Sequence, residues 1–166
     1  MEERTFVAIK PDGVERNLIG EIIRRYESAG LRIIALKMLT VSKDLISEHY
    51  PSEDEYLISI GKKSEKAGDV VKDYREQGLM IVTAMRTYMT SGPVAAMVIV
   101  GENAIKRVRE ITGYTDPVTA DKGTIRGDLG QDSILKANSE KRPVKNLIHA
   151  SGNKEEAEKE IKLWFG

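Results

Sequence analysis

The feature that most limits how this chain can fold is an order of strand, helix and strand that occurs twice. Residues 5–9, TFVAI, are rich in β-branched and aromatic residues and predict a strand that ends in a Pro-Asp-Gly turn at residues 11–13. Apolar residues spaced i, i+3, i+4, i+7 then predict a helix over residues 19–26, which Gly30 ends. Residues 31–39 are apolar at odd and even positions, which predicts a strand covered on much of both faces.

The second half of the chain repeats this order. Residues 94–100, VAAMVIV, are the clearest buried strand, and an apolar face over residues 104–112 predicts the helix after it. Residues 144–148 predict a fourth strand, and Asn153 with Glu156 forms a capping box that begins a last helix. Two such units favour an α+β, ferredoxin-like split-βαβ sandwich, although parallel α/β winding has the same pattern.

The segments between these units carry weaker patterns. A short helix is predicted over residues 42–50, and residues 51–68 are loop-like. Apolar residues from Val70 to Tyr74 suggest one more helix, which Gly78 would end. Residues 114–145 have little periodicity, and a long unpatterned loop in a compact domain is usually functional or mobile.

Composition excludes several classes of function. The 26 basic and 26 acidic residues balance, so the chain has no overall attraction for nucleic acid or anionic membranes, and any anion needs a local site. The absence of cysteine excludes disulfides and cysteine catalysis. The acidic start does not resemble a signal peptide, and no apolar run is long enough to span a membrane, so we expect a cytoplasmic protein. The two histidines, His49 and His149, lie far apart in sequence, so ligand spacing predicts no metal site.

Phosphate binding would have to rely on side chains. The glycine-rich residues 123–130 match neither the Walker nor the dinucleotide pattern. Lys10 at a strand end, Arg109 late in a helix and Arg126 in the glycine-flanked loop come from separate segments and could converge on one polyanion. Alternatively, Lys10 and Arg109 are solvated surface charges, and a loop that is tight only for packing would also place glycines around Arg126.

His149 ends the short apolar run in NLIHASGN and is followed by small residues that leave one side of its ring open. Helical spacing puts Glu160 at the edge of the buried face of the last helix, from which it could reach Ser151 and His149. This arrangement would supply a nucleophile, a hydroxyl and an orienting carboxylate. The alternatives are a hydrogen-bonded structural histidine and a solvated glutamate.

Eight segments, spread in order over most of the chain, resemble nucleoside diphosphate kinase. They are AIKPDGVER (8–16), HY (49–50), SGPVAAMV (91–98), GENAIKRVRE (101–110), TDP (115–117), GTIRGD (123–128), NLIHAS (146–151) and EEAEKEIKLWF (155–165). The resemblance implies one domain over residues 1–166, with a four-stranded antiparallel sheet. It also implies a homo-oligomer, with a hexamer favoured and a tetramer possible.

The activity implied by the resemblance is a ping-pong transfer of the γ-phosphate from a nucleoside triphosphate to a diphosphate through a phosphohistidine. Mg²⁺ would arrive with the nucleotide phosphates, and neither nucleic acid nor membrane is an expected partner. Carried over by position, the resemblance implies that His149 is the nucleophile and that Ser151 and Glu160 orient it. It implies that the phosphates are clamped by Lys10, which is also catalytic, and by Arg109 and Arg126. The remaining implied contacts are Tyr50 on the phosphate side of the cleft, Thr115 with phosphate and Asn146 with the sugar.

The chain also departs from the family pattern. Residues of about 51–87 form an insertion, so no base-stacking residue is assigned, and the loop of about 129–143 is extended. Gly152 stands where the family usually has aspartate. Two other hypotheses are an RNA-binding or ligand-binding regulatory module, disfavoured by zero net charge and only two phenylalanines, and an inactive oligomeric scaffold, which should have lost the nucleophile or the clamps.

Overall fold

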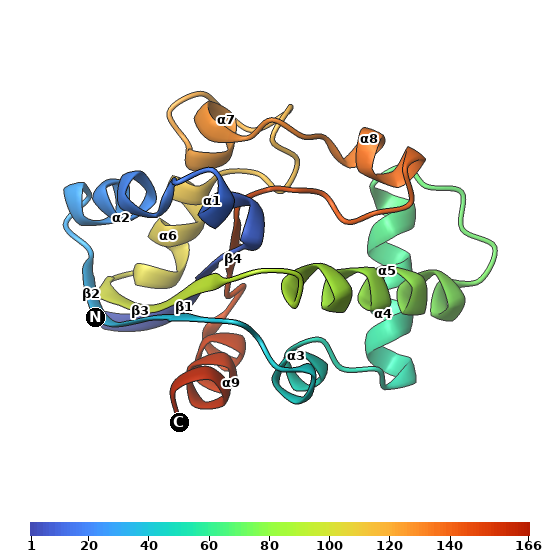
Figure 1. The fold of residues 1–166 in the computed structure, drawn as a ribbon, viewed down its shortest axis with the longest axis horizontal. Coiled ribbons are helices and arrows are strands. Elements are labelled where there is room, and N and C mark those ends of the chain that lie inside the picture. Colours follow the sequence, from blue (N-terminus) through green and yellow to red (C-terminus); the bar gives the residue numbers. More distant parts are fainter.

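The computed structural model describes residues 1–166, which form one four-stranded sheet with helices on both faces (Figure 1). The strands are β1 (Glu2–Ile9), β2 (Arg32–Leu39), β3 (Val94–Glu102) and β4 (Ile148–Ala150). Their order is β2-β3-β1-β4, and every neighbouring pair is antiparallel. This confirms the split-βαβ sandwich and shows that parallel winding is wrong.

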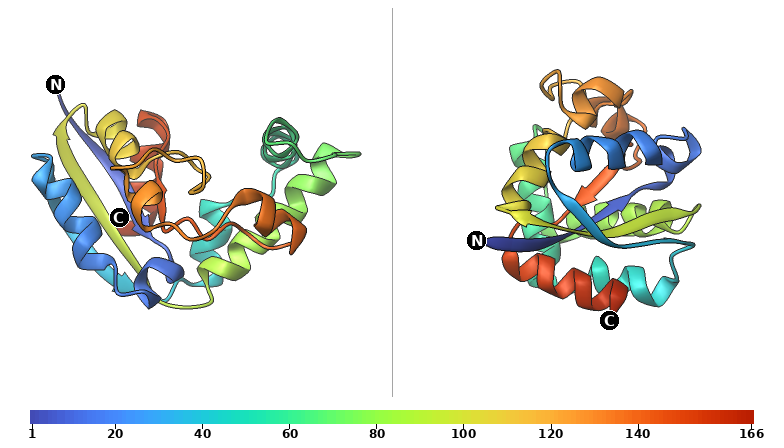
Figure 2. Two further views of the ribbon diagram at one scale, coloured as in Figure 1. Left: turned by 90° about the horizontal axis from the view of Figure 1, so that it is seen from above. Right: turned by 90° about the vertical axis from the view of Figure 1, so that its left-hand side faces the viewer.

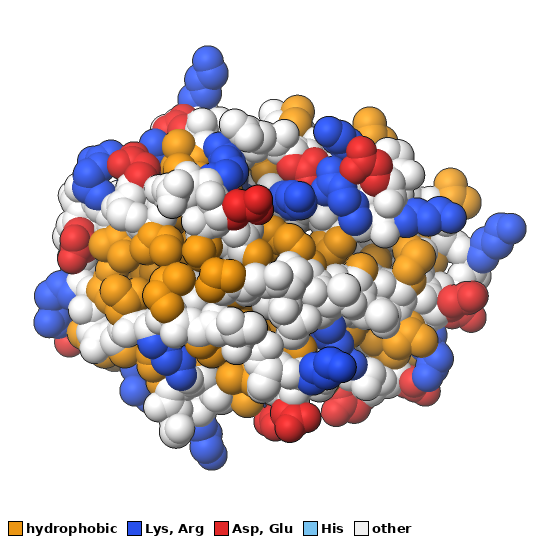
Figure 3. Space-filling model, viewed as in Figure 1, with side chains coloured by type: hydrophobic (Ala, Val, Ile, Leu, Met, Phe, Trp, Pro, Cys, Tyr) orange, Lys and Arg blue, Asp and Glu red, His pale blue; other side chains and the backbone are white.

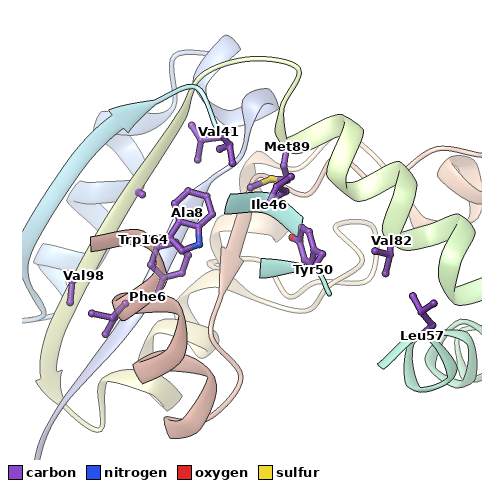
Figure 4. Packing of buried hydrophobic residues seen from close by; sticks show 13 residues of the cluster. Phe6, Ala8, Val41, Ile46, Tyr50, Leu57, Val82, Met89, Val98 and Trp164 are labelled. Atoms are coloured by element: carbon purple, nitrogen blue, oxygen red, sulfur yellow. The ribbon is translucent and has the colours of Figure 1, made fainter. Parts of the chain in front are cut away.

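The two faces of the sheet bury separate apolar clusters because side chains alternate along each strand. On β1, Phe6 and Ala8 face one cluster, and Val7 and Ile9 face the other. Helices α3 (Lys43–His49) and α9 (Lys154–Phe165) cover the first face, and α2 (Ile19–Ser28) and α6 (Ala104–Thr112) cover the second (Figure 2). Trp164 of α9 packs on Phe6, with ring centroids 5.0 Å apart (Figure 4).

The ends of the main helices follow the local signals in the sequence. Gly30 and Gly113, just past α2 and α6, have positive φ of 78° and 92°. The Asn153 side chain accepts a hydrogen bond from the backbone N–H of Glu156 at 2.9 Å, so the predicted cap of α9 is confirmed. None of the helices is long and apolar enough to cross a lipid bilayer.

Both outer strands differ from the sequence prediction. β2 lies at the edge of the sheet and is not covered on both faces, since Ile34, Leu36 and Met38 are 56%, 51% and 53% exposed. Figure 3 shows hydrophobic side chains gathered over the part of the surface where the strands lie. β4 begins at Ile148 rather than at residue 144, because Leu147 has φ 72°, which is incompatible with an extended strand.

The connecting segments contain more helix than the sequence predicted. The expected loop after Tyr50 includes α4 (Asp54–Lys66), and α5 (Tyr74–Met89) continues through Gly78 instead of ending there. A Cβ at Gly78 would lie 1.9 Å from the Leu57 carbonyl oxygen, so this glycine allows α4 and α5 to cross closely. Short helices also form at the first turn and in the unpatterned segment: α1 (Pro11–Glu15), α7 (Ile125–Leu129) and α8 (Ile134–Ser139).

Candidate active site

His149 of β4 is held on one side by α9. Its Nε2 lies 2.9 Å from Oε1 of Glu160, and the second carboxylate oxygen accepts a 2.5 Å hydrogen bond from the Ser151 hydroxyl. The His149 side chain is 20% exposed, whereas Ser151 is fully buried. Since a carboxylate only accepts hydrogen bonds, Nε2 must carry the proton in a neutral ring, and the lone pair is left on Nδ1. The predicted arrangement of these three residues is therefore present.

Glu160 is a negative charge near both imidazoles. Burial tends to raise the pKa of its carboxyl, but the hydrogen bond and charge of His149, with His49 and Ser151, lower it below the ordinary value overall. A carboxylate that stays ionised there can stabilise positive charge on His149.

A second imidazole lies against the first. The His49 ring, from the end of α3, meets His149 edge to face with centroids 4.6 Å apart. Trp164 Nε1 donates to His49 Nδ1 at 3.1 Å, and burial, followed by the nearby His149, lowers the pKa of His49 to about 3. His49 is thus a neutral imidazole that is held in place beside the His149 ring. Although the two histidines lie far apart in sequence, the fold brings one ligand atom each of His49, His149 and Glu160 within 4.8 Å of one another.

Lys10 and Asn146 form the next part of the site. Lys10, at the end of β1, donates from Nζ to Asn146 Oδ1 at 2.9 Å, and Asn146 Nδ2 donates to the Thr115 carbonyl at 3.0 Å. Burial and the charge of Arg126 lower the pKa of Lys10 to about 8, although Asp12 opposes them. Lys10 is therefore not the solvated surface charge that composition alone favoured.

The two arginines differ in their environment. Arg126 of α7 donates to the backbone carbonyls of Asn146 and Gly113, at 3.0 and 3.1 Å, and to that of Ile148, so part of its guanidinium holds the chain next to His149. Arg109 of α6 is exposed, and its guanidinium makes no hydrogen bond. A Cβ at Gly152 would lie 3.4 Å from Arg109 Nη1, which places this free cation beside the turn after His149.

Comparison with known proteins identifies the architecture around His149. A sequence model described as nucleoside diphosphate kinase matches residues 3–57 and 73–166. The chain belongs to the nucleoside diphosphate kinase family. A curated nucleoside diphosphate kinase from Pyrobaculum aerophilum is 45% identical over 98% of this chain and 94% of its own length.

Two solved structures extend the comparison. The crystal structure of an NDP kinase from Pyrobaculum aerophilum superimposes with a TM-score of 0.94 at 44% identity, covering 100% of this chain and 97% of that one. A nucleoside-diphosphate kinase from Borrelia burgdorferi, solved as a transition-state mimic with vanadate and ADP, has a TM-score of 0.84 at 32% identity, covering 99% and 88%. The sandwich is thus the fold of nucleoside diphosphate kinases over the whole chain.

In this nucleoside diphosphate kinase fold, a cavity of about 330 Å³ adjoins the site. Lys10, Tyr50 and Thr115 line it at one end, and the Tyr50 ring lies 6.3 Å from that of His149. Its other walls include Ile60 and Ser64 of α4, which lie in residues 58–72, the segment that the family match omits. The segment that the family match omits therefore contributes to the wall of the cavity.

Of the site residues expected from the sequence, Lys10, Tyr50 and Thr115 line this cavity. The others lie around His149 and Asn146 or, for Arg109, beside Gly152. The sequence did not point to Asp12 and Tyr88. The Tyr88 hydroxyl donates to Asp12 Oδ1 at 2.6 Å, and Asp12 Oδ2 accepts the Leu147 backbone N–H at 3.0 Å. Asp12 stands in a Pro-Asp-Gly motif that is typical of a turn, so the local sequence gave no sign of a buried carboxylate. Its burial, at 7% exposure, is a property of the tertiary fold alone.

Proposed function

We propose that His149 carries the phosphate that this family member transfers from a nucleoside triphosphate to a nucleoside diphosphate. The supporting observation is the hydrogen bond between Nε2 and Glu160, which leaves the Nδ1 lone pair on a partly exposed ring. Nδ1 attacks the γ-phosphorus as the bond from that phosphorus to the bridging oxygen breaks, and the diphosphate leaves. A β-phosphate oxygen of the second nucleotide then attacks the same phosphorus, and the N–P bond breaks.

Ser151 and Glu160 orient the nucleophile in this proposal. Phosphorylation makes the imidazole cationic, and the Glu160 carboxylate at 2.9 Å stabilises that charge. Ser151 fixes the second carboxylate oxygen, so that the ring cannot turn its Nδ1 away from the cleft. Both residues are buried, which keeps their geometry constant through the reaction cycle.

The charge on the transferred phosphate is balanced by Lys10, Arg109 and Arg126. Phosphoryl transfer depends mainly on positioning and charge neutralisation, and these three cations come from three different elements around His149. We assign Tyr50 and Thr115, which line the cavity, to the phosphate side, and Asn146 to the sugar. The cavity walls are largely apolar, which suits nucleosides of several kinds.

We infer that Mg²⁺ enters with the nucleotide. One cluster of possible metal ligands, His49, His149 and Glu160, offers two imidazole nitrogens, and its carboxylate is already hydrogen-bonded to His149 and Ser151. Mg²⁺ prefers oxygen ligands and often takes them from phosphates. Bound with the nucleotide, the metal would neutralise part of the phosphate charge, while the protein residues hold the phosphates.

We further propose a homo-oligomer, with a hexamer favoured over a tetramer. The exposed apolar face of the edge strand β2 supports self-association, because a monomer would leave Ile34, Leu36 and Met38 in water. The cytoplasmic location and the lack of a nucleic-acid partner stay predictions from the sequence. The comparisons give no support to the inactive scaffold, and the chain has His149, Lys10, Arg109 and Arg126.

The deciding experiment uses γ-labelled ATP and Mg²⁺ with the purified protein, followed by removal of free nucleotide. We expect acid-labile label on His149 that leaves as GTP when GDP is added. The variant His149→Ala should bind no label and retain its fold by circular dichroism. A well-folded wild-type protein that takes up no label, or a labelled His149→Ala variant, would contradict the proposal.

A further inference from the structure

The backbone just before β4 is strained. Leu147 has φ 72°, and the Ile148 N–H donates to the Asn146 carbonyl at 2.8 Å, which closes a three-residue turn. A γ-turn with positive φ at a side-chain-bearing residue costs roughly 1–3 kcal/mol and persists only where neighbouring groups hold it. The turn lies two residues before His149, so its relaxation would move the ring.

Contacts from Asp12, Lys10 and Arg126 hold the backbone of this turn. The Leu147 N–H donates to Asp12 Oδ2 at 3.0 Å, and the Leu147 carbonyl accepts from the Lys10 backbone N–H at 2.8 Å. Arg126 Nε donates to the Asn146 carbonyl at 3.0 Å. Asp12 therefore supplies the one side-chain acceptor for the N–H of the strained residue itself.

Asp12 is itself fixed by α5. The Tyr88 hydroxyl donates to Asp12 Oδ1 at 2.6 Å and accepts from the Asp12 backbone N–H at 2.9 Å. With Asp12 only 7% exposed, water cannot easily replace these partners. A continuous chain of hydrogen bonds thus runs from α5 through Asp12 to the turn before β4.

The Asp12 carboxylate is also the negative charge that acts on the two cations Lys10 and Arg126. Lys10 on β1 faces Asn146, Arg126 on α7, Asp12 on α1 and the neutral His49 on α3. Of the charged groups, Arg126 lowers the pKa of Lys10 and Asp12 raises it, and Asp12 also raises the pKa of Arg126. Removing the carboxylate would leave two cations facing each other before any nucleotide binds.

We propose that Asp12 is a positioning residue for phosphate transfer: its carboxylate holds the Leu147 turn, and with it Asn146 and His149, and supplies the countercharge for Lys10 and Arg126. This rests on the proposed role of His149. Asp12 makes no hydrogen bond to His149, so it acts through the backbone and through the charge it presents to Lys10.

The test compares Asp12→Asn with Tyr88→Phe. Asp12→Asn keeps the shape of the side chain and an acceptor oxygen but removes the negative charge. Tyr88→Phe leaves the charge on Asp12 and removes the hydroxyl that anchors it. We would measure the rate at which ATP phosphorylates His149 between pH 6 and pH 10. The matched control is Asp54→Asn, an exposed aspartate that is paired with Arg75 and does not line the cavity.

We expect Asp12→Asn to slow phosphorylation roughly tenfold or more, because small displacements of a nucleophile are costly. Activity needs protonated Lys10 and is lost as pH rises through its pKa of about 8, so loss of the carboxylate should move this alkaline limb to lower pH, by roughly half a unit or more. Tyr88→Phe should slow the reaction roughly three- to tenfold without moving the limb. The Asp54→Asn control should match the wild type.

The proposal is wrong if Asp12→Asn keeps its rate within about twofold, or loses rate with an unmoved alkaline limb. If Asp12→Asn does not fold, Tyr88→Phe decides, since a wild-type rate in that variant would contradict the anchor. A wild-type protein that takes up no label refutes the proposed role of His149 instead, so the two failures are distinguishable.

Discussion

At the residue scale, the site combines groups that the sequence predicts with groups that only the fold reveals. Glu160 follows from helical spacing, because it flanks the buried face of α9, and the structure confirms its contacts with Ser151 and His149. Asp12 could not be predicted, since its partner Tyr88 is 76 positions away and lies beyond Gly78, where the sequence predicted that the helix would end. A polar residue such as Asp12 is buried in the site by contacts with residues far away in the sequence. Local sequence patterns do not reveal such contacts.

The charge of Glu160 should matter more than its shape. Glu160→Gln keeps the volume but removes the carboxylate that stabilises the cationic phosphoimidazole, so we expect phosphorylation by ATP to slow roughly 10- to 100-fold, equivalent to about 1.4–2.7 kcal/mol. Single-turnover labelling measures this. Glu158→Gln, on the same helix but exposed and paired with Arg4, is the control and should keep the wild-type rate. Equal rates in both variants would remove Glu160 from the mechanism.

At the element scale, the sequence predicts the periodic segments but neither α4 nor the full length of α5. The helices α2, α6 and α9 carry apolar stripes and local end signals, and the structure places them as predicted. Glycine usually indicates the end of a helix, so the sequence predicts that Gly78 ends the helix that precedes it. In the structure it lies inside α5, where the absence of a side chain lets the Leu57 carbonyl approach. The same residue type serves both purposes, and only the neighbouring helix distinguishes them.

The helix crossing can be tested with two glycines. In Gly78→Ala the new Cβ would sit 1.9 Å from the Leu57 carbonyl oxygen, so α4 and α5 must separate, and we expect a loss of about 1–3 kcal/mol in the free energy of unfolding. Gly20→Ala, in α2 with no atom within 4 Å of its Cβ, should stabilise the protein by up to about 1 kcal/mol. Urea denaturation measures both. A Gly78→Ala variant as stable as Gly20→Ala would show that the close crossing is absent.

At the scale of the whole molecule, β2 shows why an apolar pattern can be correct and its interpretation wrong. Its residues are apolar at both odd and even positions, which indicates cover on both faces, yet within one chain alternate residues are partly buried and the others are exposed. The strand also has a free edge, because β3 is its only neighbour. A strand that is apolar on both faces but covered by its own chain on only one is expected where a second copy covers the other face.

That interpretation makes the last prediction, a loss of assembly on charging the face. Leu36→Lys places an ammonium at the centre of the exposed row, where burial against another subunit would cost more than the contact gains, so the molar mass in solution should fall towards that of the monomer. Leu135→Lys is the control, because Leu135 on α8 is 82% exposed and lies outside this row. Light scattering at several concentrations measures the mass. If Leu36→Lys assembles like the wild type, β2 lies outside the interface, and its apolar face needs another explanation.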